Sequence, residues 1–387
     1  MKVIWISHTN QLRGAERSLV EAVRGLVQRG VEIHAVVPSR GKLARTFESI
    51  DVPFSVIRLR WWMSPTGKRS LVRRSKNFYC ILQAWRQLSK LIRKIRPDLV
   101  VTNTLTIPFG AFAAKSTGTP HVWYIHELGE MDLGLLFDFG ESLSLYLINK
   151  LSQRIIVNSI RVRDQFQERI SPAKLRLVSY GVEIPPKPSL SPKKRVSFGL
   201  VLVGTVTAGK RQEDAIKAVS LLVKRGFSIR LTLVGTSNTE YDNYLCQLTK
   251  DLAIEEFVEF IDFTENPFSY FIHSDVALMC SKHEAFGRVT VEAMKLGKPV
   301  IGANSGGTVE LIQDGWNGLL YQPGDVEDLA TKIETLCNDR TLLRNMGKNA
   351  EVWANQTFNI DKYTASLLKV FTEVINESKP TVNGCDA

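Results

Sequence analysis

Two glutamates, Glu284 and Glu292, lie eight positions apart in the segment HEAFGRVTVE (283–292). On a single helix, eight residues would separate the two carboxylates by roughly 12 Å along the axis and by about 80° around it. That separation is too large for a pair of carboxylates that work together as acid and base. The regular spacing nevertheless raises the question of which single ligand would need a carboxylate at each end of this segment.

The surrounding residues predict where this helix begins and ends. We expect it to start near Phe286–Gly287 and to run to Leu296, with Gly297 as its cap, so that Glu284 lies in the preceding loop. Free N–H groups at a helix start favour an anion, and a carboxylate beside them suits neutral sugar hydroxyls better than a metal. HEAFG also lacks the second histidine of the H-E-x-x-H zinc motif. The alternative is an ordinary amphipathic helix.

A second glycine-rich segment, GTVTAGKR (204–211), follows the apolar run SFGLVLV. It matches the G-x-x-x-x-G-K core of a P-loop, but Arg211 stands where the Mg²⁺-binding Ser or Thr is required. Ordinary P-loop chemistry is therefore excluded. The remaining interpretations are a turn whose bases, Lys210 and Arg211, bind a phosphate or diphosphate, and a turn with solvated bases.

Three further strand-to-helix turns carry candidate residues. Gly306 and Gly307 precede a helix expected near Thr308, and Gly14 lies in LRGAERS (12–18). Glycines at such turns allow close approach of the backbone to a ligand. His126 directly follows the run HVWYI (121–125), and a structural and a catalytic role are equally well supported for it.

Short apolar runs alternate with helical patterns in two series, which predicts parallel sheets wound by crossover helices. The fold class is therefore α/β, with two Rossmann-like domains whose parallel sheets face a central cleft. We expect domains over 1–183 and 196–360, joined by a Pro-rich linker over 184–195. A C-terminal helix over 361–376 is expected to return to the first domain, and residues 377–387 are expected to form a mobile tail.

Composition limits the class of protein. Five cysteines are scattered without a CxxC pair, which fits a reducing compartment and no metal site. The N-terminal MKVIWISH reads as a first strand rather than a signal peptide, and no apolar run reaches the roughly 20 residues that a membrane span needs. We expect a cytoplasmic protein.

The net positive charge of the chain is concentrated in one segment. No acidic residue occurs between Asp51 and Asp98, where the chain holds many of its arginines and lysines. Adjacent tryptophans beside these bases favour docking on an anionic membrane, on the inner face of the plasma membrane. Nucleic acid is disfavoured as a partner, and a merely solvated basic face is the alternative. The predicted membrane or acceptor patch comprises Trp61, Trp62, Lys68, Arg69, Arg73, Arg74 and Lys76.

The segment HEAFGRVTVEAMKLGKPVIGANSGGTVELIQDGWNGLLYQPGD (283–325) closely resembles the donor-site signature of the retaining GT-B glycosyltransferases of family 4 (group 1). The family's pair of glutamates with seven residues between them corresponds to Glu284 and Glu292. RGAERSLVEAV, RIIVNS, VSYGVEI and VGTVTAGKRQEDAI extend the resemblance over nearly the whole chain. It implies an N-terminal acceptor domain and a C-terminal domain that binds a nucleotide-diphosphate sugar.

The resemblance also implies residue roles. Glu284 would bind hydroxyls of the donor sugar, Glu292 the ribose, and Lys210 the diphosphate leaving group, while His126 would lie near the anomeric carbon. The residues implied as catalytic are His126, Lys210 and Glu284. The implied donor site comprises Gly14, Thr205, Lys210, Arg211, Phe263, Thr264, Glu284, Ala285, Phe286, Gly287, Arg288, Glu292, Gly306 and Gly307.

The implied reaction is a metal-independent, front-face transfer of a sugar, without a cofactor, to a lipid-linked or polysaccharide-precursor acceptor, with retention of the anomeric configuration. No D-x-D motif occurs in the chain, which agrees with protein cations in place of a metal. One departure matters: Thr205 stands where the family usually has an arginine, and Arg211 where it has a glycine. The lost charge is replaced by Arg211 or by Arg288, or the protein is a weak or silent nucleotide-sugar-binding scaffold.

Overall fold

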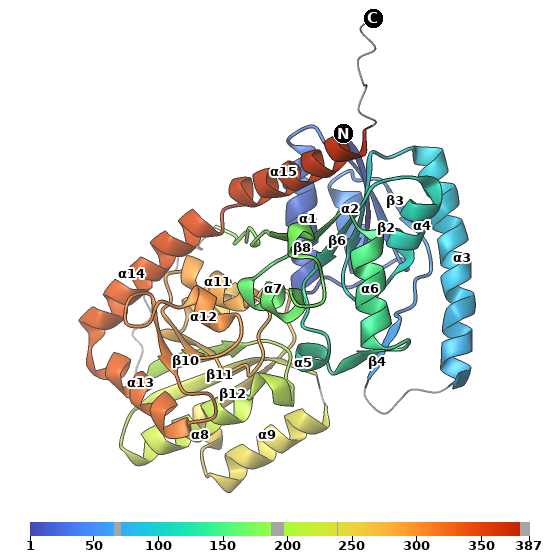
Figure 1. The fold of residues 1–387 in the computed structure, drawn as a ribbon. Helices are drawn as coiled ribbons and strands as arrows, with labels where there is room; N and C mark the ends of the chain where they lie inside the picture. The colour runs from blue at the N-terminus through green and yellow to red at the C-terminus, as the bar shows by residue number, and fades with distance from the viewer. Residues whose placement is uncertain (66–70, 187–196, 238, 380–387) are drawn as a thin grey trace, which may run out of the picture. The chain divides into compact units, whose positions relative to one another are not determined.

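The computed structural model describes residues 1–65, 71–186, 197–237 and 239–379, and it divides the chain into two compact units. The first unit comprises residues 1–181 together with the C-terminal residues from 360 onward, and the second comprises residues 182–359. Each is described by itself below. Figure 1 shows the elements of both.

The first unit is built on a parallel sheet of seven strands in the order β3-β2-β1-β5-β6-β8-β9. Its central strands are buried on both faces, as in HVWYI of β6, where all five residues are buried. The strands are β1 (Lys2–Ile6), β2 (Glu32–Val37), β3 (Phe54–Val56), β5 (Leu99–Asn103), β6 (His121–Ile125), β8 (Arg154–Val157) and β9 (Leu175–Leu177). A separate antiparallel pair joins β4 (Met63–Pro65) and β7 (Leu135–Phe137).

Helices connect these strands and cover the sheet. The longest of the connecting helices, α3, carries much of the basic segment and packs on α4, and its side chains Ala84, Leu88 and Ile92 are buried against β1 and β5 residues. The helices are α1 (Gly14–Val27), α2 (Lys42–Ser49), α3 (Leu71–Ile95), α4 (Phe109–Thr117), α5 (Glu130–Leu133), α6 (Glu141–Leu151) and α7 (Ile160–Phe166).

The C-terminal helix α15 (Ile360–Ser378) belongs to the first unit and lies along α1, as Figure 1 shows. Phe371 packs edge-on against Trp5, with ring centroids 5.7 Å apart. Glu373 accepts hydrogen bonds from Arg154 and Arg176 of the strands β8 and β9. These contacts make α15 part of the core of this unit.

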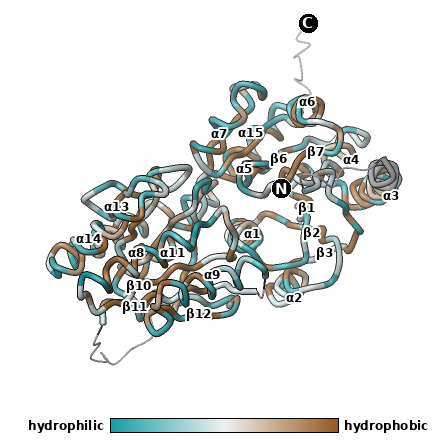
Figure 2. The backbone as a smooth tube through the Cα atoms, turned by 90° about the horizontal axis from the view of Figure 1, so that it is seen from below, coloured by the Kyte–Doolittle hydropathy of each residue, from teal (hydrophilic) through white to brown (hydrophobic). Residues whose placement is uncertain are grey.

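The second unit is a parallel sheet of six strands in the order β12-β11-β10-β13-β14-β15, wrapped by helices. Its strands are β10 (Phe198–Val203), β11 (Ile229–Thr236), β12 (Val258–Asp262), β13 (Val276–Met279), β14 (Val300–Ala303) and β15 (Gly318–Tyr321). Its helices are α8 (Gln212–Lys224), α9 (Glu240–Asp251), α10 (Phe268–Ile272), α11 (Arg288–Lys295), α12 (Thr308–Leu311), α13 (Val326–Asn338) and α14 (Arg340–Thr357). In Figure 2 the strands β10 and β11 are traced mainly in the colour of hydrophobic residues, in agreement with their burial.

Both sheets reverse their strand order at one point, between β1 and β5 in the first unit and between β10 and β13 in the second. Open parallel sheets bind ligands outside the carboxyl ends of the strands at such a point. The loops that follow β1, β5, β10 and β13 are therefore the ones that the fold places at candidate sites.

The predicted fold class, two Rossmann-like α/β domains with parallel sheets, is confirmed. The structure puts the first boundary at residues 181/182, and residues 187–195 of the linker expected over 184–195 lie outside the described residues. The helix expected over 361–376 is α15, which continues to Ser378 into the segment expected as a tail; residues 380–387 lie outside the described part. No helix in the described ranges is both long enough and apolar enough to span a bilayer.

Candidate functional site

The loops that follow β10 and β13 are joined by their backbones in the second unit. After β10 the chain makes a short 3₁₀ turn, Ala208–Lys210, and Arg211 then adopts a left-handed conformation with φ 51° before α8 begins. The N–H of Lys282, after β13, donates to the carbonyl of Gly209 with an N–O distance of 3.0 Å. The two loops thus form one continuous surface at the switch point of this sheet.

Lys210 and Glu284, predicted from separate motifs, form an ion pair between these loops. The Lys210 Nζ lies 2.6 Å from Glu284 Oε2. The Lys210 side chain is 35% exposed and that of Glu284 14% exposed, so the pair lies at the surface of the unit rather than in its core. A ligand with a phosphate for the lysine and a hydroxyl for the carboxylate can exchange with this pair at modest cost.

The position of α11 explains the spacing of Glu284 and Glu292. Gly287, at φ 93°, ends the loop, and Arg288 opens the helix, so Glu284 precedes the helix and Glu292 lies within it, as predicted. Glu292 is buried, and its Oε1 accepts a hydrogen bond from Nε of Arg288 one turn earlier, at 2.9 Å. Glu292 is therefore a charged, buried side chain held by a neighbour on its own helix.

Gly306 and Gly307 lie against the backbone of the loop that carries Glu284. A Cβ at Gly306 would lie 2.7 Å from the Glu284 carbonyl oxygen, and one at Gly307 would lie 2.6 Å from that of Ala285. The N–H of Gly307 donates to the Glu284 carbonyl at 2.7 Å. The two glycines thus allow the turn before α12 to brace the loop that carries Glu284.

The remaining donor-site predictions are distributed around these loops. Thr205 is exposed on the loop after β10, and its carbonyl accepts a hydrogen bond from Gln212. Arg211 forms a two-pronged ion pair with Asp214, Nε to Oδ2 at 2.7 Å and Nη2 to Oδ1 at 2.9 Å. Phe263, after β12, is 53% exposed. Ala285, Phe286 and Thr264 lie in the loops after β13 and β12, and the roles predicted for all these residues stay predictions.

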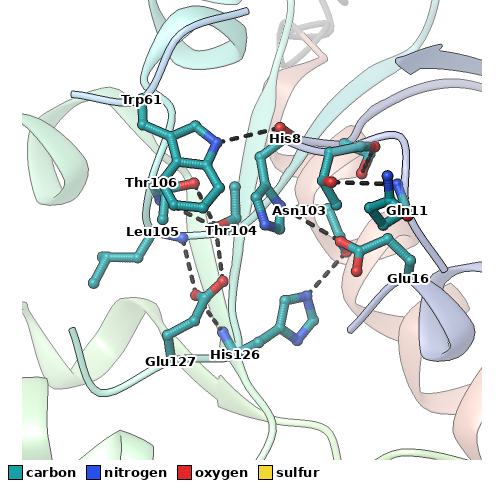
Figure 3. Close-up of polar contacts among 12 residues, drawn as sticks. His8, Gln11, Glu16, Trp61, Asn103, Thr104, Leu105, Thr106, His126 and Glu127 are labelled. Atoms are coloured by element: carbon teal, nitrogen blue, oxygen red, sulfur yellow. Dashed lines mark hydrogen bonds and ion pairs between the residues drawn. The ribbon is translucent and has the colours of Figure 1, made fainter. Parts of the chain in front are cut away.

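In the first unit, His126 is a buried member of a hydrogen-bonded network (Figure 3). The indole N–H of Trp5 donates to Asn103 Oδ1 at 3.2 Å, and because an indole can only donate, the amide oxygen must face it. His126 Nε2, 3.0 Å from the same oxygen, must therefore carry the proton. Its Nδ1 then accepts from the Tyr180 hydroxyl at 2.6 Å.

This network leaves His126 neutral. Burial, and secondarily the nearby His8, lower the pKa of His126 to about 3. Since both ring nitrogens already bond protein groups, the imidazole can take a proton from a substrate only by giving up one of these bonds. The catalytic role predicted for His126 stays a prediction, and its geometry is that of a structural histidine.

The neighbouring Glu127 braces the loop after β5 (Figure 3). Its carboxylate accepts hydrogen bonds from the Thr104 hydroxyl at 2.7 Å and from the N–H groups of Leu105 and His126, each at 3.1 Å. Burial raises its pKa nonetheless. Asn103 Nδ2, by contrast, is buried and has no hydrogen-bond partner among the described residues.

A second buried acid, Glu16, was not singled out from the sequence. It lies in the first turn of α1, and its Oε1 is 3.5 Å from Nδ1 of His8, which follows β1 (Figure 3). Burial raises the pKa of Glu16 to about 8 and lowers that of His8 to about 4, so the contact joins two neutral groups. Glu16 lies in the motif RGAERS, in which the sequence predicts a role for Gly14 alone. Gly14 is the first residue of α1.

The predicted membrane patch is wrong at Trp62. Its side chain is 2% exposed and donates to the carbonyl of Leu105, and the ring stacks on Trp123, so it belongs to the core. Trp61 is 38% exposed and bonds the carbonyl of His8 (Figure 3). Lys68 and Arg69 lie outside the described residues. Arg73, Arg74 and Lys76 are on α3, where the structure does not describe their side chains.

Comparison with known families covers both units. The sequence model "Glycosyltransferase Family 4" matches residues 12–184, and "Glycosyl transferases group 1" matches residues 187–353. Together they span most of the chain, including the Lys210 and Glu284 loops. The chain belongs to the family 4 (group 1) glycosyltransferases.

Individual relatives agree with this membership. N-acetyl-alpha-D-glucosaminyl L-malate synthase of Bacillus anthracis is 33% identical over 46% of this chain and 46% of its own length. The capsular polysaccharide biosynthesis glycosyltransferase CapM of Staphylococcus aureus is 26% identical over 47% of this chain and 48% of its own. The chain thus matches about half the length of these curated relatives.

Solved structures resemble the whole chain. Anabaena HepE, in complex with UDP and glucose, superposes with a TM-score of 0.79 at 23% identity, covering 96% of this chain and all of HepE. A glycosyltransferase from Rickettsia africae gives 0.80 at 18% identity, covering 97% of this chain and 98% of its own. At these identities the likeness establishes the GT-B fold.

Proposed function

We propose that the protein transfers a sugar from a nucleotide-diphosphate donor to a carbohydrate or lipid-linked acceptor, with retention of configuration. The observation that carries the proposal is the Lys210–Glu284 pair, 2.6 Å apart at the switch point of the second sheet. It presents one cation and one carboxylate side by side, which is what a sugar joined to a phosphate requires.

Each of these two groups has a distinct task in the proposed reaction. Lys210 neutralises the charge that develops on the leaving diphosphate, and a preorganised charge of this kind is worth several kcal/mol in a transition state. Glu284 accepts hydrogen bonds from hydroxyls of the donor sugar and so orients its ring. Glu292, about one turn into α11, binds the ribose. The proton of the acceptor hydroxyl passes to the departing phosphate, so the proposed route needs neither a carboxylate nucleophile nor a metal.

A donor screen tests this function directly. We expect one of the UDP-, GDP- or ADP-sugars to raise the melting temperature of the wild type, and the same donor to stabilise Glu284→Ala much less. Ligand at 100 times its Kd contributes about 2.7 kcal/mol to folding stability. Equal stabilisation of both proteins would show that Glu284 does not bind the donor. Anomeric analysis of the product by NMR tests retention, and inversion would refute it.

A non-catalytic nucleotide-sugar-binding protein is the second candidate. It is favoured by the neutral Thr205 and by the pairing of Arg211 with Asp214, which together leave few free charges for a diphosphate. Donor hydrolysis and transfer assays separate the two candidates. Release of nucleotide diphosphate at a rate that depends on Lys210 supports the enzyme, whereas tight donor binding without turnover supports the alternative.

Docking on an anionic membrane, which we also propose, does not involve Trp62, because that side chain is buried. It now depends on the basic residues of the segment between Asp51 and Asp98. Flotation with vesicles containing an anionic phospholipid is expected to recover the protein at low salt and to release it at high salt. No recovery at low salt would refute docking.

A further inference from the structure

Three of the cations at the donor loops of the second unit are already neutralised by carboxylates. Lys210 pairs with Glu284, Arg211 with Asp214, and Arg288 with Glu292. Asp214 and Glu292 are buried, so the two arginines balance carboxylates that would otherwise be stranded in the protein. Removing either arginine from its carboxylate to bind a ligand would cost several kcal/mol.

A diphosphate therefore lacks a second positive charge from these residues. It carries at least two negative charges when bridged to a sugar, and the Lys210–Glu284 pair supplies one exchangeable cation. Position 205, exposed on the same loop, holds a neutral threonine. Some other cation near the loop after β10 is needed to balance the remaining charge.

Lys282 fulfils this requirement by position. It is an exposed residue two positions before Glu284, and its backbone N–H bonds the carbonyl of Gly209, next to Lys210. Within the described ranges its ammonium forms no ion pair or hydrogen bond. A lysine carries a compact charge on a long, flexible stem, which lets it close on a bound phosphate.

We propose that Lys282 is the second diphosphate-binding cation of the donor site. This rests on the proposed function, because it presumes that the loops after β10 and β13 hold a nucleotide-diphosphate sugar. Lys282 binds the diphosphate alongside Lys210, while Arg211 and Arg288 keep their structural carboxylates. The site therefore distinguishes a nucleoside diphosphate from a monophosphate through a residue outside the glutamate motif.

Calorimetric titration with UDP, GDP and ADP, and with their monophosphates, tests the assignment. For the diphosphate that the wild type binds, Lys282→Ala is expected to raise Kd about 10- to 100-fold, the worth of one charge-assisted hydrogen bond. The Kd of the matching monophosphate should change less than about threefold. Lys282→Arg should keep most of the affinity for the diphosphate.

Two further variants make the result decisive. Lys224→Ala removes an exposed lysine at the end of α8 and should leave every Kd unchanged. Thr205→Arg combined with Lys282→Ala returns a charge to the same loop and should recover part of the lost affinity, which a folding defect would not do. Equal diphosphate affinity of wild type and Lys282→Ala overturns the role of Lys282 alone. A wild type that binds none of the three diphosphates overturns this role together with the proposed function.

Discussion

The strand ends of the two units carry similar kinds of residue but use them differently. In the first unit, His126 and Glu127 form hydrogen bonds with other groups of the protein, in a buried network. In the second, Lys210 and Glu284 form a partly exposed ion pair, a type of contact worth only about 0–1 kcal/mol. A polar residue after a strand is thus available to a ligand only if replacing its existing hydrogen bonds or ion pair by contacts with the ligand costs little free energy.

The sharpest test of this comparison is Lys210→Ala. We expect the rate of transfer to fall about 10²- to 10³-fold, because one preorganised charge on the leaving group is lost. In Lys210→Ala/Glu284→Ala the loss should be smaller than the product of the two single losses, since the side chains contact each other. Fully multiplicative losses would show that the pair does not act as a unit.

Glu16, a buried acid of the first unit, should make the free energy of unfolding depend on pH. The folded state keeps a proton on Glu16 up to about pH 8, whereas the unfolded chain releases it near pH 4.5. Stability therefore falls as pH rises through this window. Glu16→Gln removes that loss, and from pH 5 to pH 9 it should gain about 4 kcal/mol relative to wild type in urea unfolding. A difference that does not vary with pH would contradict a protonated Glu16.

A smaller effect is expected where α15 joins the first unit. Arg176, and then Arg154, lower the pKa of Glu373 to about 2, so their bonds stabilise the fold above about pH 4.5 and are lost as pH falls toward 2. Glu373→Gln should lower the melting temperature at pH 7 by about 2–4 °C, and the difference should vanish near pH 2. Glu48→Gln, which removes an exposed pair with Arg40, is the control and should have little effect.

The smallest effect on chemistry is expected at His126. Because both ring nitrogens bond Asn103 and Tyr180, we expect His126→Gln to keep kcat within about tenfold of wild type. General acid–base residues typically contribute 10²- to 10⁴-fold. Profiles of kcat against pH from 5 to 9 provide the measurement. A hundredfold loss, together with a vanished limb of the profile, would restore a catalytic role.

Local spacing explains why part of the site was predictable from sequence. Glu284 before α11 and Glu292 within it follow from the positions of Gly287 and Gly297. The Arg288–Glu292 pair is also predictable, because the two residues are four apart on one helix, although the family resemblance implies a ligand-binding role for Arg288. The alternating strands of both sheets were predictable for the same reason.

Contacts between distant segments were not predictable. Nothing near His126 in the sequence indicates that Asn103 and Tyr180 will satisfy its ring, and nothing near Trp62 indicates that Trp123 will cover it. The strands β3, β4, β7 and β9 each have only three residues, too few for a clear period. Pairing of Lys210 with Glu284 depends on the order of β10 and β13 in the sheet, which only the fold supplies.

The return of α15 to the first unit has a consequence for synthesis of the chain. Nascent domains generally fold in order from the N-terminus. Here Trp5, in the first strand, packs against Phe371, so the sheet of the first unit lacks part of its cover until residues 360–378 have been made. The second unit, continuous from residue 182 to residue 359, has all its elements earlier. On the ribosome, the unit that begins first is therefore the one that is completed last.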